Sequence, residues 1–269
     1  MKVLTVVGAR PQFVKAAPVS RALRDEHNEL LVHTGQHYDD AMSAAFFREL
    51  EIPAPDLNLE VGSGSHATQT ADILRRLEPV IGENEPDGVI VYGDTNSTLA
   101  GAVVASKMQY GNGRRPWLAH IEAGLRSFNP AMPEERNRIV ADHLSDLLLA
   151  PTPAAIDNLA GEGLAQRSEL VGDVMVDTFR WAAPLADAHL PDVARDLDGY
   201  VLLTLHRAEN VDDPQRLASL IAMLGVGRPV IFPVHPRTLE AIGRGALELP
   251  PNVRAIDPVG YLAMLALER

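Results

Sequence analysis

Residues 88–107 read GVIVYGDTNSTLAGAVVASK, and this stretch indicates the fold class. Its first five residues form a nearly continuous apolar run, which favours a parallel β-strand covered on both faces over a half-exposed, alternating strand. A turn follows at Gly93, and a helical pattern begins near residue 96. A buried strand, a short turn and a helix form the repeating unit of doubly wound α/β proteins.

The same order of strand, turn and helix recurs along the first part of the chain. The apolar runs that predict strands lie at 2–7, 30–34, 88–92, 117–121 and 146–150. The segments between them that predict helices lie at 11–24, 40–50, 67–83, 96–109, 133–144 and 153–162. This alternation predicts a doubly wound, Rossmann-like α/β domain over residues 1–170.

The pattern restarts after residue 170. Strands are predicted at 200–205, 229–234 and 253–256, with helices near 214–224 and 236–247. We therefore expect two Rossmann-like domains, residues 1–170 and residues 171–269, with a cleft between them. Three strands and a final helix make only half of a doubly wound sheet, so we expect the second domain to be incomplete.

The composition restricts the classes of function. The 269 residues include 24 Lys and Arg against 36 Asp and Glu, and the resulting formal net charge of −12 would repel nucleic acid. No apolar run approaches the length of a membrane span, and the N-terminus lacks the long apolar core of an export signal. We therefore expect a cytoplasmic protein with no nucleic-acid or membrane partner. The chain has no cysteine, which excludes disulfides and thiolate metal sites.

The loop after the first predicted strand places two cations at the start of a helix. It reads GARPQFVK, in which Gly8 permits a tight turn and Pro11 suits the first position of a helix. Arg10 and Lys15 then lie in or near the first turn, where exposed backbone N–H groups and cations favour a bound phosphate. The loop is neither a GxGxxG nor a Walker sequence, which argues against NAD binding and P-loop ATP chemistry.

Several carboxylates occupy the ends of strands in the first predicted domain. Asp94 follows one strand and Glu122 follows the next, while Glu134 and Glu135 open the helix that comes after. Because ligands of open α/β sheets bind beyond the carboxyl ends of the strands, these side chains are candidates for one crevice, with Arg138 one turn further on. Structural alternatives exist, since Asp94 is a favoured helix cap and a first-turn Glu complements the helix dipole.

Two histidines follow strands of the second predicted domain. His206 stands in TLHRAEN and His235 in PVHPR. A single histidine is more often structural, but two at equivalent strand ends favour a place in the same cleft. His33 and His37 straddle a strand end and a turn rather than one helix face, so we predict no metal site.

The ordered motifs of the chain resemble those of one known family. GARPQFVKAAP, HTGQHYD, VYGDTNST, HIEAGLRS, MPEERNR, APT, TLHRAEN and PVHPR occur in the order seen in the non-hydrolysing UDP-N-acetylglucosamine 2-epimerases. The resemblance covers essentially the whole chain. HTGQHYD, HIEAGLRSFN and MPEERNR look closest to the branch that acts on UDP-2,3-diacetamido-2,3-dideoxyglucuronic acid. The resemblance implies a fold like that of GT-B glycosyltransferases, with the nucleotide in the interdomain cleft, a homodimer, and a reaction without NAD or another cofactor.

The same resemblance implies a mechanism and the residues that carry it. The C2–H of such a sugar is not adjacent to a carbonyl, so the family eliminates UDP to give a glycal and adds UDP back to the opposite face. This route needs acid/base groups at C2 and stabilisation of the departing diphosphate. The positions that match catalytic residues are Asp94, Glu122, Glu134 and His206. The positions that match substrate contacts and their support are Arg10, Lys15, Arg138 and His235.

Three alternatives remain open. The first is the same C2 epimerisation on the diacetamido-glucuronic acid nucleotide, whose C6 carboxylate calls for a spare cation such as Arg126 or Arg136. The second is a GT-B glycosyltransferase, which needs an acceptor surface that the low aromatic content does not suggest. The third is a nucleotide-sugar binding protein without catalysis, which would not exchange the C2 proton with solvent.

Overall fold

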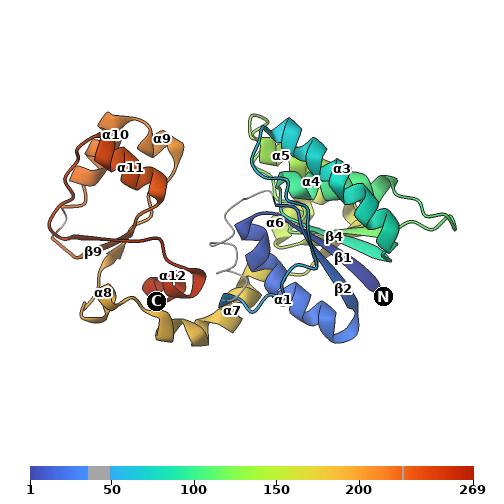
Figure 1. Ribbon diagram of the computed structural model, residues 1–269, viewed down its shortest axis with the longest axis horizontal. Coiled ribbons are helices and arrows are strands. Elements are labelled where there is room, and N and C mark those ends of the chain that lie inside the picture. Colours follow the sequence, from blue (N-terminus) through green and yellow to red (C-terminus); the bar gives the residue numbers. More distant parts are fainter. Residues whose placement is uncertain (36–48, 226) are drawn as a thin grey trace. The chain divides into compact units, whose positions relative to one another are not determined.

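The computed structural model describes residues 1–35, 49–225 and 227–269. By its internal contacts the chain divides into two compact units, Met1–Arg180 and Trp181–Arg269 (Figure 1). Most of the helix predicted at 40–50, and His37 with it, falls outside the described residues. The division into domains at residue 170 stays a prediction. None of the described helices has the length and apolar character needed to cross a membrane.

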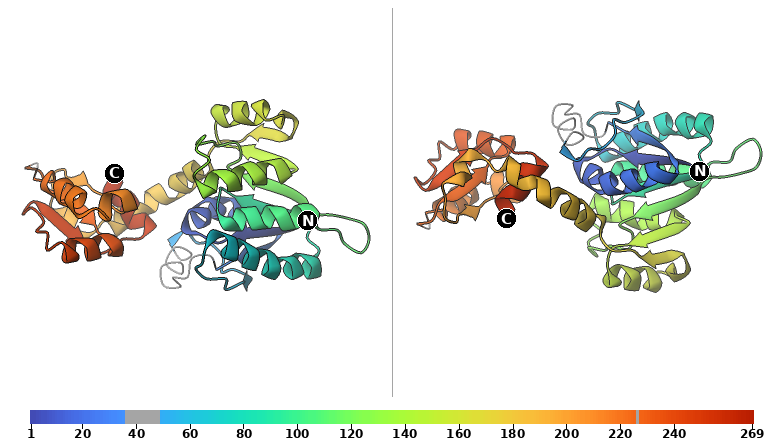
Figure 2. Two further views of the ribbon diagram at one scale, coloured as in Figure 1. Left: turned by 90° about the horizontal axis from the view of Figure 1, so that it is seen from above. Right: turned by 90° about the horizontal axis from the view of Figure 1, so that it is seen from below.

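The described part of unit 1 is built on one seven-stranded parallel sheet with the strand order β3-β2-β1-β4-β5-β6-β7. Figure 2 shows strands of this sheet running side by side with helices packed on them. The strands are β1 (Lys2–Val7), β2 (Asn28–His33), β3 (Leu57–Asn58), β4 (Gly88–Tyr92), β5 (Trp117–Ile121), β6 (Leu147–Ala150) and β7 (Ser168–Leu170). All neighbouring strands pair in parallel, as their continuous apolar sequences predict.

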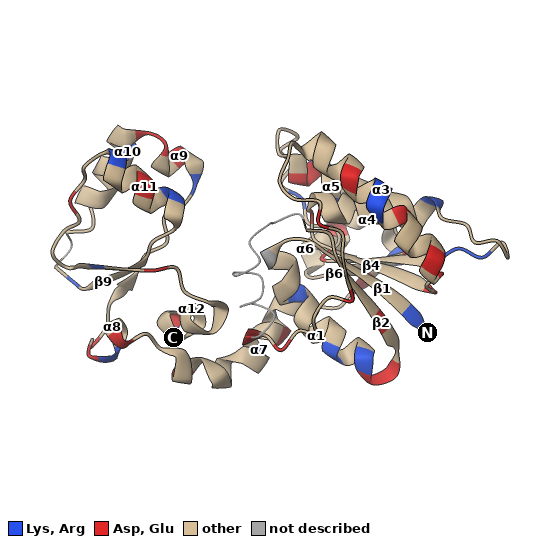
Figure 3. Ribbon diagram, in the orientation of Figure 1, with Lys and Arg blue, Asp and Glu red and all other residues tan. Residues whose placement is uncertain are grey.

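Helices connect these strands and cover the sheet. They are α1 (Arg10–Glu26), α3 (His66–Asn84), α4 (Asn96–Lys107), α5 (Pro133–Leu144) and α6 (Pro153–Gly161), with a short 3₁₀ turn at Ala165–Arg167. Helix α7 (Val174–Ala186) follows β7 and spans the boundary between the two units. Figure 1 shows α3, α4 and α5 on one face of the sheet and α1 on the other. Acidic residues are interspersed with basic ones along α3 and α11 (Figure 3), so neither helix carries a continuous basic stripe.

The core of unit 1 lies between the central strands and the α3–α4 layer. Val89 and Val91 of β4 are fully buried and pack with Leu77 of α3 and Ala102 of α4. Gly101 allows α4 to approach the sheet closely, because a Cβ there would lie 2.8 Å from Cγ1 of Val91. Apolar burial of this extent holds the carboxyl ends of β1 and β4 rigidly in place.

Unit 2 contains a smaller parallel sheet with the strand order β10-β9-β8. Its strands are β8 (Val201–Leu202), β9 (Val230–Pro233) and β10 (Val253–Ile256). Its helices are α8 (Asp192–Arg195), α9 (Ala208–Val211), α10 (Pro214–Ala222), α11 (Pro236–Arg244) and α12 (Tyr261–Glu268), with a 3₁₀ turn at Asp187–His189. Phe232 and Val234 pack with Leu217 and Ile221 of α10 in its core. The second half of the strand predicted at 200–205 is a loop, which leads into α9.

The strand order of unit 1 reverses between β1 and β4. From β1 the chain runs to β2 on one side of the sheet, and β4 lies on the other side. Ligands of doubly wound sheets bind at such a switch point. The backbone is tightly packed here, since a Cβ on Gly8 would lie 2.1 Å from Oγ1 of Thr34 and 2.2 Å from Oγ of Ser97. The loops after β1, β2 and β4 therefore meet at the place where a ligand is expected.

Candidate active site

A buried glutamine joins the loops at the switch point. The side-chain oxygen of Gln12 accepts hydrogen bonds from the backbone N–H groups of Gly8 at 2.8 Å and Ala9 at 3.1 Å. Its amide nitrogen donates to the Tyr92 carbonyl at 2.9 Å and to Oγ1 of Thr98 at 3.1 Å. The amide oxygen accepts two hydrogen bonds and the amide nitrogen donates two, so the hydrogen-bonding capacity of the side chain is fully used. These bonds fix the start of α1 against the end of β4. Gln12 is not recognisable from the sequence, because the two acceptors of its amide nitrogen, in Tyr92 and Thr98, lie 80 and 86 residues away along the chain.

Lys15 and Glu122 form an ion pair beside the turn that follows β4. Nζ of Lys15 donates to Oε2 of Glu122, and the two side chains are 12% and 21% exposed. A Cβ placed on Gly93 would lie 3.2 Å from this Glu122 oxygen and 3.3 Å from Nζ of Lys15. The pair therefore lies against the residue that precedes Asp94. The sequence-predicted phosphate-binding cation and strand-end carboxylate are in direct contact.

The backbone of Glu122 adopts a conformation that non-glycine residues rarely use. Its φ is +71°, in the left-handed region, which costs about 1–3 kcal/mol for such a residue. The N–H groups of Glu122 and Ala123 both donate to the Leu149 carbonyl of β6 at 3.1 Å, which holds the turn. Strained residues of this kind cluster at functional sites, which supports the choice of Glu122 as a site residue.

Arg138 of α5 links two other carboxylates. Its guanidinium donates to Oδ2 of Asp94 and lies 3.2 Å from Oε2 of Glu135. Asp94 remains 35% exposed at the side chain, whereas Arg138 is 14% exposed. Arg138 is therefore the more buried partner of this ion pair, and it holds the partly exposed Asp94 at the switch point.

The two adjacent glutamates of α5 have different environments. Glu135 is buried and accepts hydrogen bonds from the N–H groups of Ser127 at 3.0 Å and Phe128 at 2.9 Å. Burial raises the pKa of Glu135, but these N–H groups and the charge of Arg138 outweigh burial and leave its pKa below the usual range. Glu134 instead lines a cavity. The structure thus places Glu134 where the sequence analysis predicted a site carboxylate.

This cavity has a volume of about 190 Å³ and lies at the switch point. It is lined by residues from the start of α1, the start of α3, the β4–α4 turn and α5: Ala9, Pro11, His66, Asp94, Thr95, Asn96, Glu134 and Asn137. His66 was not predicted as a site residue. Its Nδ1 lies 3.2 Å from the side-chain nitrogen of Asn96, and no motif in the sequence marks it. Among the described residues, no group of three or more His, Asp or Glu forms a metal site.

The remaining predicted site residues are placed as follows. Arg10 begins α1, and its side chain is outside the described part of the structure. In unit 2, His206 lies in the loop after β8 and His235 caps α11, and their ring centroids are 6.0 Å apart. Both are exposed. The structure therefore brings the two strand-end histidines together.

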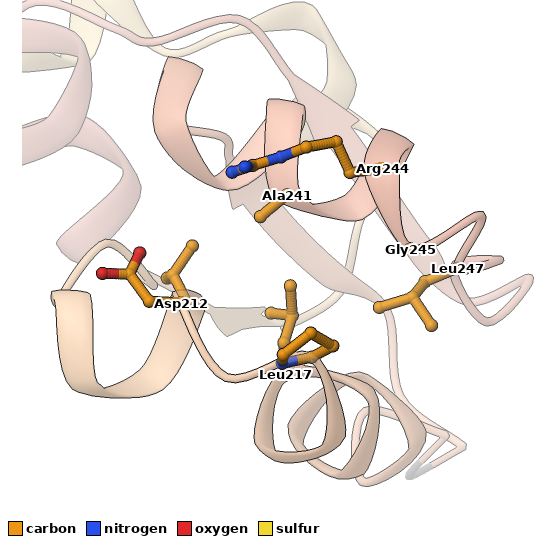
Figure 4. Close-up of a pocket in the computed structure, with 8 residues that line it drawn as sticks. Asp212, Leu217, Ala241, Arg244, Gly245 and Leu247 are labelled. Atoms are coloured by element: carbon orange, nitrogen blue, oxygen red, sulfur yellow. The ribbon is translucent and has the colours of Figure 1, made fainter.

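Unit 2 also contains a separate cavity of about 350 Å³ between α9, α10 and α11 (Figure 4). Its walls are mostly apolar, and Asp212 and Arg244 stand at its edge. None of the residues predicted to bind or act on a substrate lines it. The candidate site of unit 1 therefore lies at its switch point, and the candidate residues of unit 2 are the histidine pair rather than the lining of this cavity.

Comparison with known proteins decides the family. Residues 21–269 match the family model described as UDP-N-acetylglucosamine 2-epimerase. The chain belongs to this epimerase family. A UDP-2,3-diacetamido-2,3-dideoxy-D-glucuronate 2-epimerase of Pseudomonas aeruginosa is 49% identical over 276 residues, which cover 99% of this chain and 75% of the relative.

Solved structures of epimerases agree with this assignment. The UDP-GlcNAc 2-epimerase of Methanocaldococcus jannaschii, in complex with UDP-GlcNAc and UDP, is 40% identical with a TM-score of 0.84 and covers 100% of this chain and 76% of its own. The enzyme of Neisseria meningitidis bound to UDP-GlcNAc is 27% identical with a TM-score of 0.85, covering 99% and 75%. The chain is thus a GT-B-like α/β epimerase, an isomerase that acts on UDP-sugars, which confirms the resemblance seen in the motifs.

Proposed function

We propose that this epimerase interconverts UDP-N-acetylglucosamine and UDP-N-acetylmannosamine, and that Asp94, Glu122 and Glu134 are its acid/base group. One observation carries the assignment of the site. Two of these carboxylates line one cavity at the switch point, and Glu122 lies against the glycine that precedes Asp94. These three carboxylates therefore lie at the switch point, where doubly wound folds bind their ligands.

The proposed reaction explains why several carboxylates are needed. Elimination removes the C2 proton and the UDP group, and the C–O bond at C1 breaks as the C1–C2 double bond of the glycal forms. Re-addition of UDP at C1 with protonation of C2 from the opposite face completes the inversion. A base on one face of C2 and an acid on the other face are therefore required. Asp94, Glu122 and Glu134 come from three different segments of unit 1 and supply the number of ionisable groups that this scheme needs.

Negative charge develops on the diphosphate as UDP departs. We propose that Arg10 and Lys15 at the start of α1 bind this charge, and that unit 2 contributes His206 as a catalytic residue and His235 as a substrate contact. Cationic side chains are suited to a phosphate, and stabilisation of a leaving group is a large part of catalysis. The backbone N–H groups of Gly8 and Ala9 are not available to a phosphate, because they donate to Gln12. Arg138 supports the site indirectly, because it pairs with Asp94 and Glu135.

The second candidate substrate is UDP-2,3-diacetamido-2,3-dideoxyglucuronic acid. The 49% identity to the Pseudomonas aeruginosa enzyme that is named for this sugar favours it. The two cations considered for its C6 carboxylate are engaged elsewhere. The guanidinium of Arg126 is 2% exposed and pairs with Asp142 and Glu162, and Nε of Arg136 donates to the Pro130 carbonyl at 3.3 Å. Neither arginine lines the cavity of unit 1, and this geometry favours the uncharged N-acetylglucosamine.

The two substrates are separated by incubating the chain with each nucleotide and analysing the products by chromatography and NMR. We expect a manno product from UDP-N-acetylglucosamine. Product only from the diacetamido-glucuronic nucleotide would replace the first candidate by the second. Glu122→Gln is the matched variant, because it removes the ionisable group and keeps the shape. Full turnover by this variant would remove Glu122 from the acid/base group.

We also propose that the protein is cytoplasmic and works as a homodimer. The resemblance of the ordered motifs supports the dimer. Analytical ultracentrifugation tests the assembly, and a single species with the 29.1 kDa mass of one chain at assay concentration would exclude the dimer.

A further inference from the structure

His120 is a fully buried residue of β5 whose two ring nitrogens both have short polar contacts. Nδ1 lies 2.7 Å from Oδ1 of Asp142, a residue of α5 that is also fully buried. Nε2 lies 2.7 Å from the carbonyl oxygen of Gly93, in the turn after β4. None of the proposed reaction steps uses this histidine, and the sequence analysis read it as part of an apolar strand.

Both polar atoms of the His120 ring are used by groups from different elements. A carbonyl oxygen only accepts hydrogen bonds, so Nε2 donates to Gly93. Nδ1 shares a hydrogen bond with Oδ1 of Asp142. Burial raises the pKa of Asp142, but the contacts with His120 and Arg126 outweigh burial and leave its pKa below the usual range. The ring is therefore fixed between the turn after β4 and helix α5.

Asp142 also belongs to a larger network of ion pairs. It pairs with Arg126 at 2.7 Å, and Arg126 pairs with Glu162 at 2.7 Å. Glu162 is 29% exposed at the side chain and approaches His143 on the surface of α5 at 3.0 Å. The buried part of the network thus comprises His120, Asp142 and Arg126, and Asp142 is held from two sides.

This network holds the turns that carry two of the proposed catalytic carboxylates. Through Nε2, His120 binds the carbonyl of Gly93, the residue directly before Asp94. Through Asp142, it binds the other turn, because Oδ2 of Asp142 accepts a hydrogen bond from the Gly124 N–H at 3.1 Å, two residues after Glu122. The imidazole of His120 therefore links Gly93, in the turn of Asp94, to Asp142, which in turn binds Gly124 in the turn of Glu122.

We infer that His120 is a positioning residue of this epimerase, and that its two ring contacts set the placement of Asp94 relative to Glu122. The inference rests on the roles proposed above for these two carboxylates. His120 touches no substrate in this scheme, and it acts only through the backbone of the two turns. A misplacement of catalytic groups by about 1 Å lowers turnover on the order of 10²-fold.

Two substitutions separate the two contacts. In His120→Gln the side-chain amide reaches the position of Nε2 and keeps the donor to Gly93, whereas the contact with Asp142 is lost. In His120→Asn the amide occupies the position of Nδ1 and keeps the donor to Asp142, whereas the contact with Gly93 is lost. We expect both variants to lower kcat by about 10- to 100-fold with little change in KM, because neither contact involves the substrate.

A matched control distinguishes positioning from simple loss of stability. Asp146 binds β5 at its opposite end, where its Oδ2 accepts the Leu118 N–H at 3.0 Å. Asp146→Ala destabilises the same part of the sheet without touching either turn, so we expect it to keep the wild-type kcat. If the His120 variants are folded and turn over as fast as Asp146→Ala, the positioning role is wrong. If Glu122→Gln itself keeps full turnover, the proposed site is wrong. Failure of the positioning role and failure of the proposed site thus give different results.

Discussion

Gly93→Ala tests the close contact between the β4 turn and the Lys15–Glu122 pair. Gly93 has a φ of +60°, a conformation that costs a residue with a side chain about 1–2 kcal/mol. In a chain of this size, that loss lowers the melting temperature by about 2–8 °C. The added Cβ would also lie 3.2 Å from Oε2 of Glu122 and 3.3 Å from Nζ of Lys15, so the pair must move by a few tenths of an ångström. At about 10²-fold per ångström, a shift of this size lowers kcat by about 4- to 10-fold.

Gly113→Ala is the matched control for this substitution. Gly113 has a φ of +81° and no atom within 4 Å of its would-be Cβ, so it incurs the backbone cost alone. Both variants are compared by thermal unfolding and by the steady-state rate of epimerisation. We expect similar losses of melting temperature, with reduced kcat only in Gly93→Ala. Equal kcat values in the two variants would refute the claim that the placement of the Lys15–Glu122 pair matters for turnover.

Three further predictions concern neighbouring groups. Glu134→Gln should lower kcat without changing the free energy of unfolding. Glu135→Gln should lower the free energy of unfolding by about 1–3 kcal/mol, because it removes a buried charged acceptor. Urea denaturation and rate measurements on both variants check this contrast. Gln12→Ala should lower the free energy of unfolding by about 1–3 kcal/mol, because two buried N–H groups lose their acceptor, and a urea midpoint equal to wild type would contradict it. The pKa of Asp142 is lower in the folded protein than in the unfolded chain. Its carboxylate should therefore contribute fully to the free energy of unfolding at pH values above the unfolded pKa of ~3.9. This contribution should be lost as the pH falls from that value through the folded pKa. Urea midpoints measured against pH should fall less steeply in this acid range for Asp142→Asn than for wild type.

The central elements of the fold are readily predicted from the sequence. The strands predicted at 88–92 and 117–121 and the helix predicted at 133–144 coincide with β4, β5 and α5. Their apolar runs are continuous because both faces of these strands are buried, and a proline marks the start of the helix. β3 and β7 were missed. They are edge strands of two and three residues with exposed side chains, so they carry no apolar run.

The candidate site was predicted only in part. Asp94 and Glu122 are recognisable because parallel strands end at one edge of a sheet, which places polar residues after consecutive strands together. The sequence does not separate the role of Glu134 from that of Glu135, since adjacent residues share the first turn of one helix. Gln12 and His120 were missed because their functions depend on partners that tertiary folding brings near, with 80 residues between Gln12 and the Tyr92 carbonyl.

Solvent exchange at C2 tests the proposed reaction most directly. The chain is incubated with UDP-N-acetylglucosamine in D₂O, and proton NMR follows the C2 position. The account predicts that deuterium appears at C2 while UDP-N-acetylmannosamine accumulates, and that Glu122→Gln still binds UDP but shows neither change. Epimerisation that retains the original C2 proton, or UDP binding by the wild-type chain without any exchange for either candidate sugar, would contradict the proposed elimination and re-addition.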